Sequence, residues 1–179
     1  RKLQVNNHCN TQKCYLDYQQ RVNRAGGIPF RDIDEMHEKM ATLLRLKERI
    51  PVDQVLCHRE YIAEHVIRLS TGGLRVINWD FAGMDDPFFD VAMFCNRADF
   101  DRGRHELALA YYLGRAATKE ELIRLYLSIA LCGMLCTMCS LNKKRIGVNM
   151  GAFPMNKYRY AKDYYRLLED LEPSLATGV

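Results

Sequence analysis

Apolar residues recur at steps of three and four along most of the chain, which is the spacing of one face of an α-helix. The clearest case is the run of Met36, Met40 and Leu43, which share one such face. Thr118 and Glu121 stand three apart ahead of a long apolar run, as in a capping box at a helix start. The pattern predicts helices over residues 14–24, 31–49, 90–96, 102–113, from 118 to about 145, and over 156–171.

Extended segments are short and confined to the middle of the chain. Residues 55–57 are apolar and strand-like, and residues 66–69 and 74–79 flank the turn sequence Ser-Thr-Gly-Gly, as in a β-hairpin. A length of 179 residues suits one domain with a sizeable core. We therefore predict a single domain over residues 1–179 that is mainly α with a small β-hairpin.

The run from Leu125 to Asn142 contains no charged residue, so a membrane span has to be weighed against a buried helix. The run includes Ser128, Gly133 and Thr137, and it falls short of the ~20 strongly apolar residues that a bilayer requires. We predict a buried central helix and no membrane span.

Charge and cysteine usage bear on the partners and the compartment. The net charge is +4, and Lys and Arg are spread along the chain, so no nucleic-acid partner is expected. The seven cysteines are an odd number, and several lie in apolar runs. We recognise no secretory signal and predict reduced, buried thiols in a cytoplasmic protein. A disulfide between Cys9 and Cys14 would need an oxidising compartment.

The stretch from Leu56 to Gly83 has the layout of a phosphoryl-transfer site. A short strand leads into a loop that begins with His58, and a hairpin then delivers further polar residues. Phosphoryl transfer needs a base beside the attacking hydroxyl, oxygen ligands for magnesium and rigid positioning, and such a segment supplies them within ~20–25 residues. At these key positions the chain has Glu60, His65 and Asn78.

The same stretch resembles the choline/ethanolamine kinase family, and most closely the bacterial LicA-type choline kinases of the aminoglycoside phosphotransferase superfamily. The sequences RKLQVNN and YRYAKDYY also resemble flanking helices of these kinases. The resemblance implies the large, helical C-terminal lobe of a protein-kinase-like fold, with the small N-terminal lobe and its Gly-rich loop outside this chain. The residues that match in order and spacing are Cys57-His58, Ile77, Trp79, Gly83-Met84, Asp86-Pro87, Asp90 and Ala92.

The resemblance assigns catalytic and metal-binding roles, and the chain departs from the family at several of them. Glu60 stands at the catalytic Asp position, where its extra methylene moves the carboxylate by ~1 Å and would cost roughly 100-fold in rate. His65 replaces the Asn that holds the second magnesium, and Asn78 replaces the Asp that bridges metal and phosphates. Asp80 keeps an acid where the family often has Glu, and it is a third candidate metal ligand.

Three further residues are implied to hold the site in shape. His58, which belongs with Glu60 to the catalytic loop, is expected to tie that loop to the core. Asp90 is expected to be a buried acid that hydrogen-bonds the loop backbone. Trp79 is the only Trp of the chain and matches the Trp of the family motif.

On the substrate side, the family holds a quaternary ammonium group in an aromatic box by cation–π attraction. At the two box Trp positions the chain has Cys136 and Cys139, and Gly133 stands where the family has an Asp. The aromatic residues expected to compensate in part are Phe89, Tyr158 and Tyr160.

Simpler interpretations exist for several of these residues. A zinc site is disfavoured, because the segment reads as a loop and not as the helix of a zinc motif; its ligands would come from His58, Glu60, Glu64, His65 and Asp80. Small residues in a packed helix seam are favoured over a metal or redox cluster for Cys132, Cys136 and Cys139. The helical residues His37 and His105 are expected to be solvated.

Two functions are compatible with this pattern. The first is a diverged kinase that uses ATP and Mg²⁺ to phosphorylate a small amino alcohol such as choline, with Glu60 orienting the hydroxyl and with Asn78 and Asp80 holding magnesium. The second is a pseudokinase lobe that keeps the fold and acts as a binding or scaffold domain. The changes at the base and metal positions favour impaired catalysis.

Overall fold

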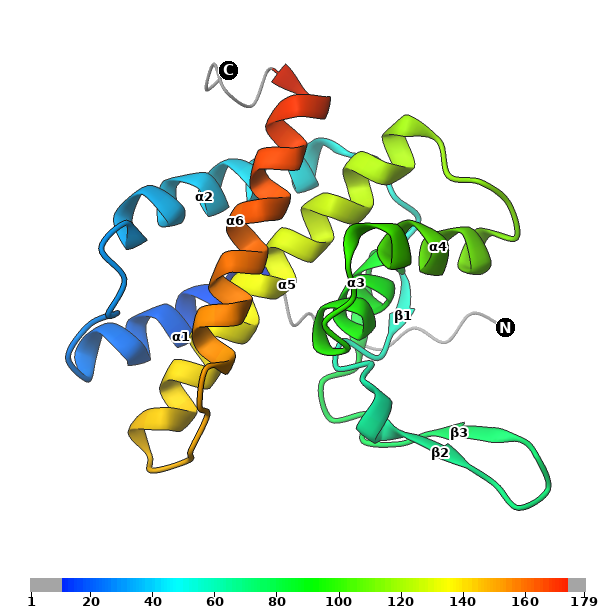
Figure 1. The fold of residues 1–179 in the computed structure, drawn as a ribbon, viewed down its shortest axis with the longest axis horizontal. Coiled ribbons are helices and arrows are strands. Elements are labelled where there is room, and N and C mark those ends of the chain that lie inside the picture. The colour runs from blue at the N-terminus through cyan, green and yellow to red at the C-terminus, as the bar shows by residue number, and fades with distance from the viewer. Residues whose placement is uncertain (1–10, 174–179) are drawn as a thin grey trace.

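The long helix α5 (Lys119–Arg145) forms the centre of this computed structural model, which describes residues 11–173. Helices α1 and α2 lie on one side of α5, α3 and α4 lie on the other, and α6 crosses it (Figure 1). Predictions that concern RKLQVNN and Cys9 fall outside the described residues. The other elements are α1 (Thr11–Arg24), α2 (Ile33–Arg49), β1 (Val55–Cys57), the 3-10 turn η1 (Ala63–His65), β2 (Val66–Arg68), β3 (Leu74–Val76), β4 (Gly83–Asp85), α3 (Phe88–Arg97), α4 (Arg102–Leu113) and α6 (Phe153–Leu171).

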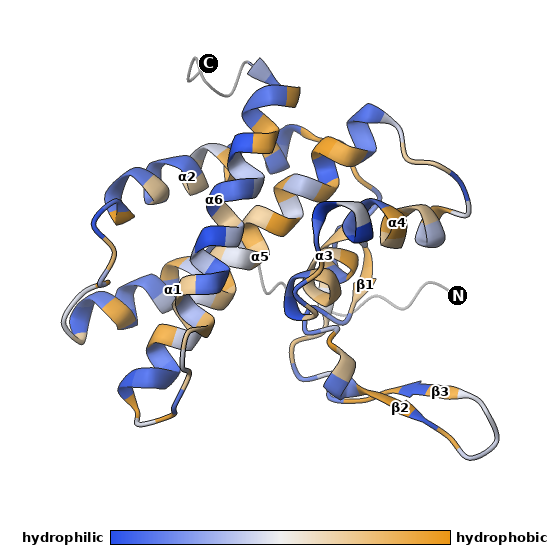
Figure 2. Ribbon diagram, in the orientation of Figure 1, coloured by the Kyte–Doolittle hydropathy of each residue, from blue (hydrophilic) through white to orange (hydrophobic). Residues whose placement is uncertain are grey.

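The start and the burial of α5 agree with the sequence pattern. Thr118 accepts a hydrogen bond from the backbone N–H of Glu121, whose carboxylate accepts one from the N–H of Thr118, so the capping box is present. Within residues 11–173, α5 is the one helix long and apolar enough to cross a membrane by length and composition. However, 67% of that apolar window is buried inside the protein. In Figure 2 the apolar residues of α5 run through the middle of the helical body, as in a central core helix.

The strands form two antiparallel pairs. The predicted hairpin is the β2–β3 pair, with Val66 opposite Val76, and it projects from the helical body (Figure 1). A second pair, β1–β4, places Val55 opposite Asp85 and Cys57 opposite Gly83. The prediction of a single hairpin was therefore incomplete, because β4 is short and far from β1 in the sequence. The β1–β4 pair fixes where the loop after β1 begins.

Two of the three cysteines predicted in a helix seam, Cys132 and Cys136, pack between helices, whereas Cys139 is half-buried. Cys132 and Cys136 are buried in α5, where they face α3. The Sγ atom of Cys132 lies 3.9 Å from the carbonyl oxygen of Phe89, and that of Cys136 lies 3.9 Å from Sδ of Met93. These contacts place both thiols in the α3–α5 seam.

The structure corrects the expectation for His105, whose side chain is fully buried and not solvated. Its Nδ1 is hydrogen-bonded to the Tyr164 hydroxyl, and its ring packs edge-on against the ring of Tyr160. Burial lowers the pKa of His105 to about 4, so the side chain is neutral at neutral pH. His37 is half-buried and hydrogen-bonded to the Tyr15 hydroxyl.

The close approach of α5 and α6 depends on Gly133. A Cβ atom at this position would lie 3.0 Å from the backbone N of Ala161 and 3.0 Å from the carbonyl oxygen of Lys157. Both are backbone atoms, so relief would require α6 to shift. A side chain at position 133, including the Asp of the family pattern, does not fit this packing.

We predict that Gly133→Ala lowers the free energy of unfolding by about 1–3 kcal/mol, because overpacking outweighs the gain in helix propensity of about 1 kcal/mol. Gly103→Ala is the matched control, since its Cβ would lie 3.6 Å from Oδ1 of Asp101, an ordinary contact. Urea denaturation of the two variants measures the difference. Equal stability would contradict the close-packing role of Gly133.

We predict that the protein loses stability as the pH falls from about 6.5, the ordinary pKa of histidine, towards the folded pKa of His105, which is about 4. The unfolded chain takes up a proton in this range while the folded chain does not, so the loss reaches about 3 kcal/mol. Urea titrations of the wild type and of His105→Asn at neutral and acid pH test this. An unchanged pH dependence in the variant would rule His105 out as its source.

Candidate active site

Asp90, in the first turn of α3, holds the loop that follows β1. Its Oδ2 accepts a hydrogen bond of 2.7 Å from the backbone N–H of His58, and its Oδ1 accepts one of 2.7 Å from that of Arg59. Burial raises the pKa of the Asp90 carboxyl, and the two loop N–H groups oppose that rise. This is the backbone-anchoring contact that the sequence suggested.

His58 ties the same loop to the strand end beyond the hairpin. Its side chain is 2% exposed, and its Nε2 donates to the carbonyl oxygen of Ile77 at 2.8 Å. Its Nδ1 accepts from the backbone N–H of Glu60 at 3.3 Å. The Trp79 ring lies 4.8 Å from the His58 ring, and its Nε1 donates to the carbonyl oxygen of Val76. His58 therefore fixes the loop that follows β1, and Trp79 packs against His58.

His65 and Asn78 are bonded to each other. The Nδ1 of His65 lies 2.9 Å from the carbonyl oxygen of Glu60, which can only accept, so this nitrogen carries the proton. Its Nε2 then accepts from the Asn78 amide at 2.9 Å. Asn78 has a φ of 63°, a left-handed conformation that Asn adopts more readily than most residues. Both ring nitrogens of His65 are engaged within the protein.

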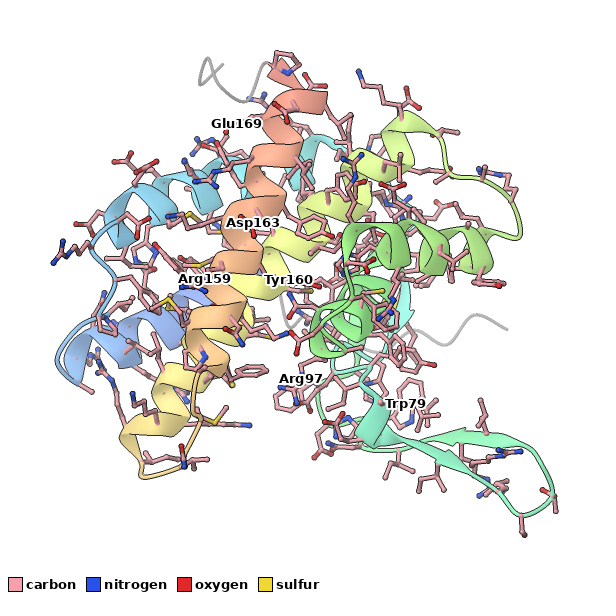
Figure 3. All side chains as sticks on the ribbon, viewed as in Figure 1. Trp79, Arg97, Arg159, Tyr160, Asp163 and Glu169 are labelled. Carbon is pink, nitrogen blue, oxygen red and sulfur yellow. The ribbon has the colours of Figure 1, made fainter. Side chains whose placement is uncertain are left out.

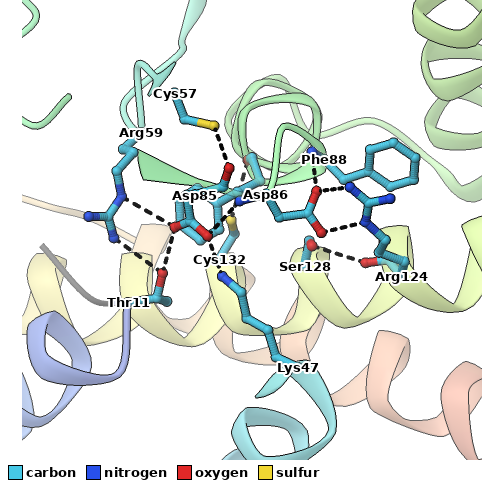
Figure 4. Close-up of polar contacts among 11 residues, drawn as sticks. Thr11, Lys47, Cys57, Arg59, Asp85, Asp86, Phe88, Arg124, Ser128 and Cys132 are labelled. Carbon is cyan, nitrogen blue, oxygen red and sulfur yellow. Dashed lines mark hydrogen bonds and ion pairs between the residues drawn. The ribbon is translucent and has the colours of Figure 1, made fainter. Parts of the chain in front are cut away.

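Arg59 is buried in a left-handed conformation, with a φ of 65° that is unusual for a long side chain. Its Nε lies 3.5 Å from Oδ2 of Asp85, and its Nη2 donates to the hydroxyl of Thr11 at 3.2 Å (Figure 4). Asp85 also accepts from Lys47 Nζ at 2.6 Å. These contacts hold the strained residue in place.

The neighbouring Asp86 is bound by α5. Arg124 donates to both of its carboxylate oxygens at 2.5 Å, and the backbone N–H of Phe88 donates at 2.8 Å (Figure 4). Asp86 therefore joins the start of α3 to α5. A cavity of about 490 Å³ borders Asp85 and Asp86, but it lies apart from Glu60, His65 and Asn78.

A larger cavity, of about 670 Å³, brings the predicted reaction residues together. It opens between the loop after β1, helices α1, α3 and α5, and the start of α6. Burial raises the pKa of the Cys136 thiol in this cavity to about 11, and nearby Arg97 opposes the rise. The predicted site residues that line it are Glu60, His65, Asn78, Phe89, Cys136 and Cys139.

Other predicted site residues lie elsewhere. Asp80 is exposed and does not line the cavity. Tyr158 is 3% exposed and stacks on Phe30 at 4.2 Å, and its hydroxyl donates to Asp32 at 2.8 Å. Tyr158 is thus a core residue between α6 and the start of α2, and the structure does not bring it to the cavity.

Arg97 was missed by the sequence reasoning. It lines the cavity, pairs with Glu64 at 3.6 Å and lies over the Phe153 ring at 4.9 Å. Phe89, Met93 and Arg97 follow at four-residue steps, so one face of α3 supplies all three to the cavity. This four-residue spacing is visible in the sequence and could have identified Arg97 as a cavity residue.

The residues present do not fit a magnesium site. His65 offers imidazole nitrogen, which suits zinc or copper better than magnesium, and both of its nitrogens are engaged. Asn78 supplies one neutral oxygen, and Asp80 lies outside the cavity. Among residues 11–173, no three His, Cys, Asp or Glu side chains are arranged to hold a metal ion.

Comparison with protein families identifies the group to which this site belongs. The model of the phosphotransferase enzyme family matches residues 12–126, which is more than half of the chain and includes the loop and the hairpin. The chain belongs to the phosphotransferase enzyme family. Two relatives named LicA from Haemophilus influenzae, one of them from strain Rd, are 25% and 24% identical over 150 residues. The matches cover 79% of this chain and 43% and 55% of the relatives, so the chain spans about half their length.

Solved structures show the same phosphotransferase fold. The choline kinase LicA from Streptococcus pneumoniae superposes with a TM-score of 0.78 at 19% identity, over 92% of this chain and 57% of that one. A choline/ethanolamine kinase family protein from Mesorhizobium loti gives 0.71 at 17%, over 94% and 57%. An ethanolamine kinase from Plasmodium vivax gives 0.64 at 13%, over 98% and 53%. These likenesses confirm the predicted kinase-like helical fold.

We predict that Asp90→Asn destabilises the protein by about 1–3 kcal/mol, because one carboxylate oxygen becomes an NH₂ group that cannot accept a loop N–H. Asp53→Asn, at an exposed loop position, is the control and should change stability little. Chemical denaturation gives the stability, and hydrogen exchange at His58 and Arg59 reports the anchoring itself. Unchanged exchange at these two amides would show that Asp90 does not hold the loop.

Proposed function

We propose that the chain carries the catalytic-loop half of a choline/ethanolamine-kinase-like phosphotransferase, in a protein of the cytoplasm. It would phosphorylate the hydroxyl of a small amino alcohol with ATP, at an impaired rate. The observation that carries this proposal is that Glu60, His65 and Asn78 line one cavity with the substrate-side residues Phe89 and Cys136. The LicA relatives and the solved choline and ethanolamine kinases support the substrate class.

Glu60 is the proposed base of the reaction. The substrate hydroxyl oxygen attacks the γ-phosphorus of ATP, and the bond from that phosphorus to its bridging oxygen breaks as ADP leaves. The hydroxyl proton passes to the Glu60 carboxylate, which faces the cavity. A carboxylate displaced by ~1 Å from its productive position would cost roughly 100-fold in rate.

A structure of LicA in complex with AMP supports a nucleotide as the second substrate of this fold. The chain's own residues contribute positioning: Asp90 and His58 fix the loop, and His65 fixes Asn78. The donor set does not fit magnesium, so the proposed step assigns no role to the ion.

A binding or scaffold role is the second candidate function. It is favoured by the hydrogen bond from the Asn78 amide to Nε2 of His65, because that bond engages an imidazole nitrogen at a position to which the family resemblance assigns metal binding. In this case the cavity still binds a small molecule, and phosphoryl transfer is lost.

We predict that Glu60→Gln lowers phosphoryl transfer by at least about 100-fold, because the amide keeps the shape of Glu60 but cannot take the hydroxyl proton. Transfer from ATP to ethanolamine or choline, measured as ADP release on the full-length protein, checks this. Glu48→Gln on α2, which does not line this cavity, is the matched control.

Equal turnover in the Glu60 variant and the wild type would remove Glu60 from the proposed role. Complete absence of ATP binding and of turnover, with magnesium or manganese, would reject the enzyme and leave the binding domain.

A further inference from the structure

Phe153 lines the large cavity, and two cations of the protein already lie over its ring. Arg97 lies over the Phe153 ring at 4.9 Å, and Lys157 lies over the same ring at 5.2 Å. A quaternary ammonium ligand binds an aromatic ring by the same electrostatic attraction, at up to about 6 Å from the centroid. A ligand cation at Phe153 would therefore be repelled by Arg97 and Lys157, which already contact this ring.

The same holds at Phe89, a buried aromatic residue that also lines the cavity. Lys47 lies 5.4 Å and Arg59 lies 5.7 Å from the centroid of Phe89. At the cavity's α1 side, Arg21 lies 5.8 Å from the centroid of Tyr18. Of the aromatic residues that line the cavity in the described chain, Phe81 is the one without a protein cation over its ring, and it is 48% exposed.

At the substrate end of the cavity, the basic residues Arg21, Arg97 and Lys143 outnumber the carboxylates Asp17 and Glu64. Gly133 has no room for a side chain against the α6 backbone. The acidic residues that line the cavity are Asp17, Glu60 and Glu64. Glu60 lies with His65 and Asn78 at the part of the cavity proposed for the reaction. The side chain of Glu64 is 67% exposed and paired with Arg97. Asp17 is exposed on α1.

Arg97 is the charged group placed to bind a ligand in this region. Its side chain is 30% exposed, and its Nη2 makes only a long pair of 3.6 Å with the exposed Glu64, which a ligand carboxylate can replace at little cost. Figure 3 shows it near the base of the hairpin. A guanidinium presents its donors as a planar fork that matches a carboxylate. Arg21 and Lys143, both exposed lining residues, add to the positive potential around this part of the cavity.

We propose that the substrate of this cavity carries a carboxylate opposite its reacting hydroxyl, held by Arg97, and that quaternary ammonium compounds bind poorly. The class is a small amino alcohol that bears a carboxylate. This inference rests on the proposed function for the assignment of Glu60 as the base, and it narrows the small amino alcohol to one that carries a carboxylate.

Three small ligands separate these substrate classes. L-serine is ethanolamine with a carboxylate added, and choline is ethanolamine with a trimethylated nitrogen. Isothermal titration calorimetry on the full-length protein measures each affinity without any need for turnover. We expect L-serine to bind at least about tenfold more tightly than ethanolamine, as one charge-assisted contact provides, and choline to bind most weakly.

Arg97→Gln is expected to remove about tenfold or more of the serine affinity and to leave the ethanolamine affinity unchanged. Arg97→Lys keeps the charge and should restore part of the serine affinity. Arg159→Gln is the control, because Arg159 is exposed on α6 away from the cavity (Figure 3). Thermal denaturation confirms that each variant folds.

Tighter binding of choline or ethanolamine than of serine overturns the inference, and so does a serine affinity that Arg97→Gln leaves intact. Failure of all three to bind overturns it as well. The proposed function fails separately: serine binding without any transfer from ATP upholds the inference and rejects the enzyme. Transfer to choline without serine binding upholds the enzyme and rejects the inference.

Discussion

Two adjacent buried carboxylates, Asp85 and Asp86, set the arrangement of the elements around them. Asp85 is bound by Lys47 from α2 and by Arg59 from the loop after β1, and Asp86 is bound by Arg124 from α5. Burying two neighbouring negative charges is costly unless each is paired and hydrogen-bonded, so removal of a single cation would leave a charge uncompensated. The β1–β4 pair ends at these residues, and α3 begins directly after them. The helices and the loop are therefore positioned by one ionic cluster.

Contacts to backbone groups fix the shape of the loop after β1, whereas the candidate reactive group of this loop is the side chain of Glu60. Asp90 and His58 fix the loop through backbone groups, which makes their contacts independent of the side chains at neighbouring positions. The side chain of Glu60 faces the cavity and contributes little to that framework. A change of side chain at this position therefore comes at small cost to the fold. This separation explains how a chain can keep the architecture of a phosphotransferase while its reaction end differs from the family pattern.

Much of the fold and part of the site were predictable from the sequence. Helix periodicity and the Thr118 capping box located α5 and most other helices, and the motif register located Glu60. The β1–β4 pair was not predictable, because three-residue strands carry almost no periodicity and their pairing is set by the ionic cluster. The burial of His105 was missed because its hydrogen-bonding partner lies on α6, and Tyr158 was misplaced because its contacts with the start of α2 are tertiary. The site assignments themselves and the single-domain boundary stay predictions.

The hydrogen bond between His65 and Asn78 explains why the changes at the metal positions need not disorder the site. The family resemblance assigns metal-binding roles to these two positions, one before the hairpin and one after it. Here the imidazole and the amide join them directly at 2.9 Å, while the other ring nitrogen of His65 closes onto the carbonyl oxygen of Glu60. The arrangement of these two side chains is thus maintained by the protein alone, and the same bond engages the His65 nitrogen that a metal ion would require.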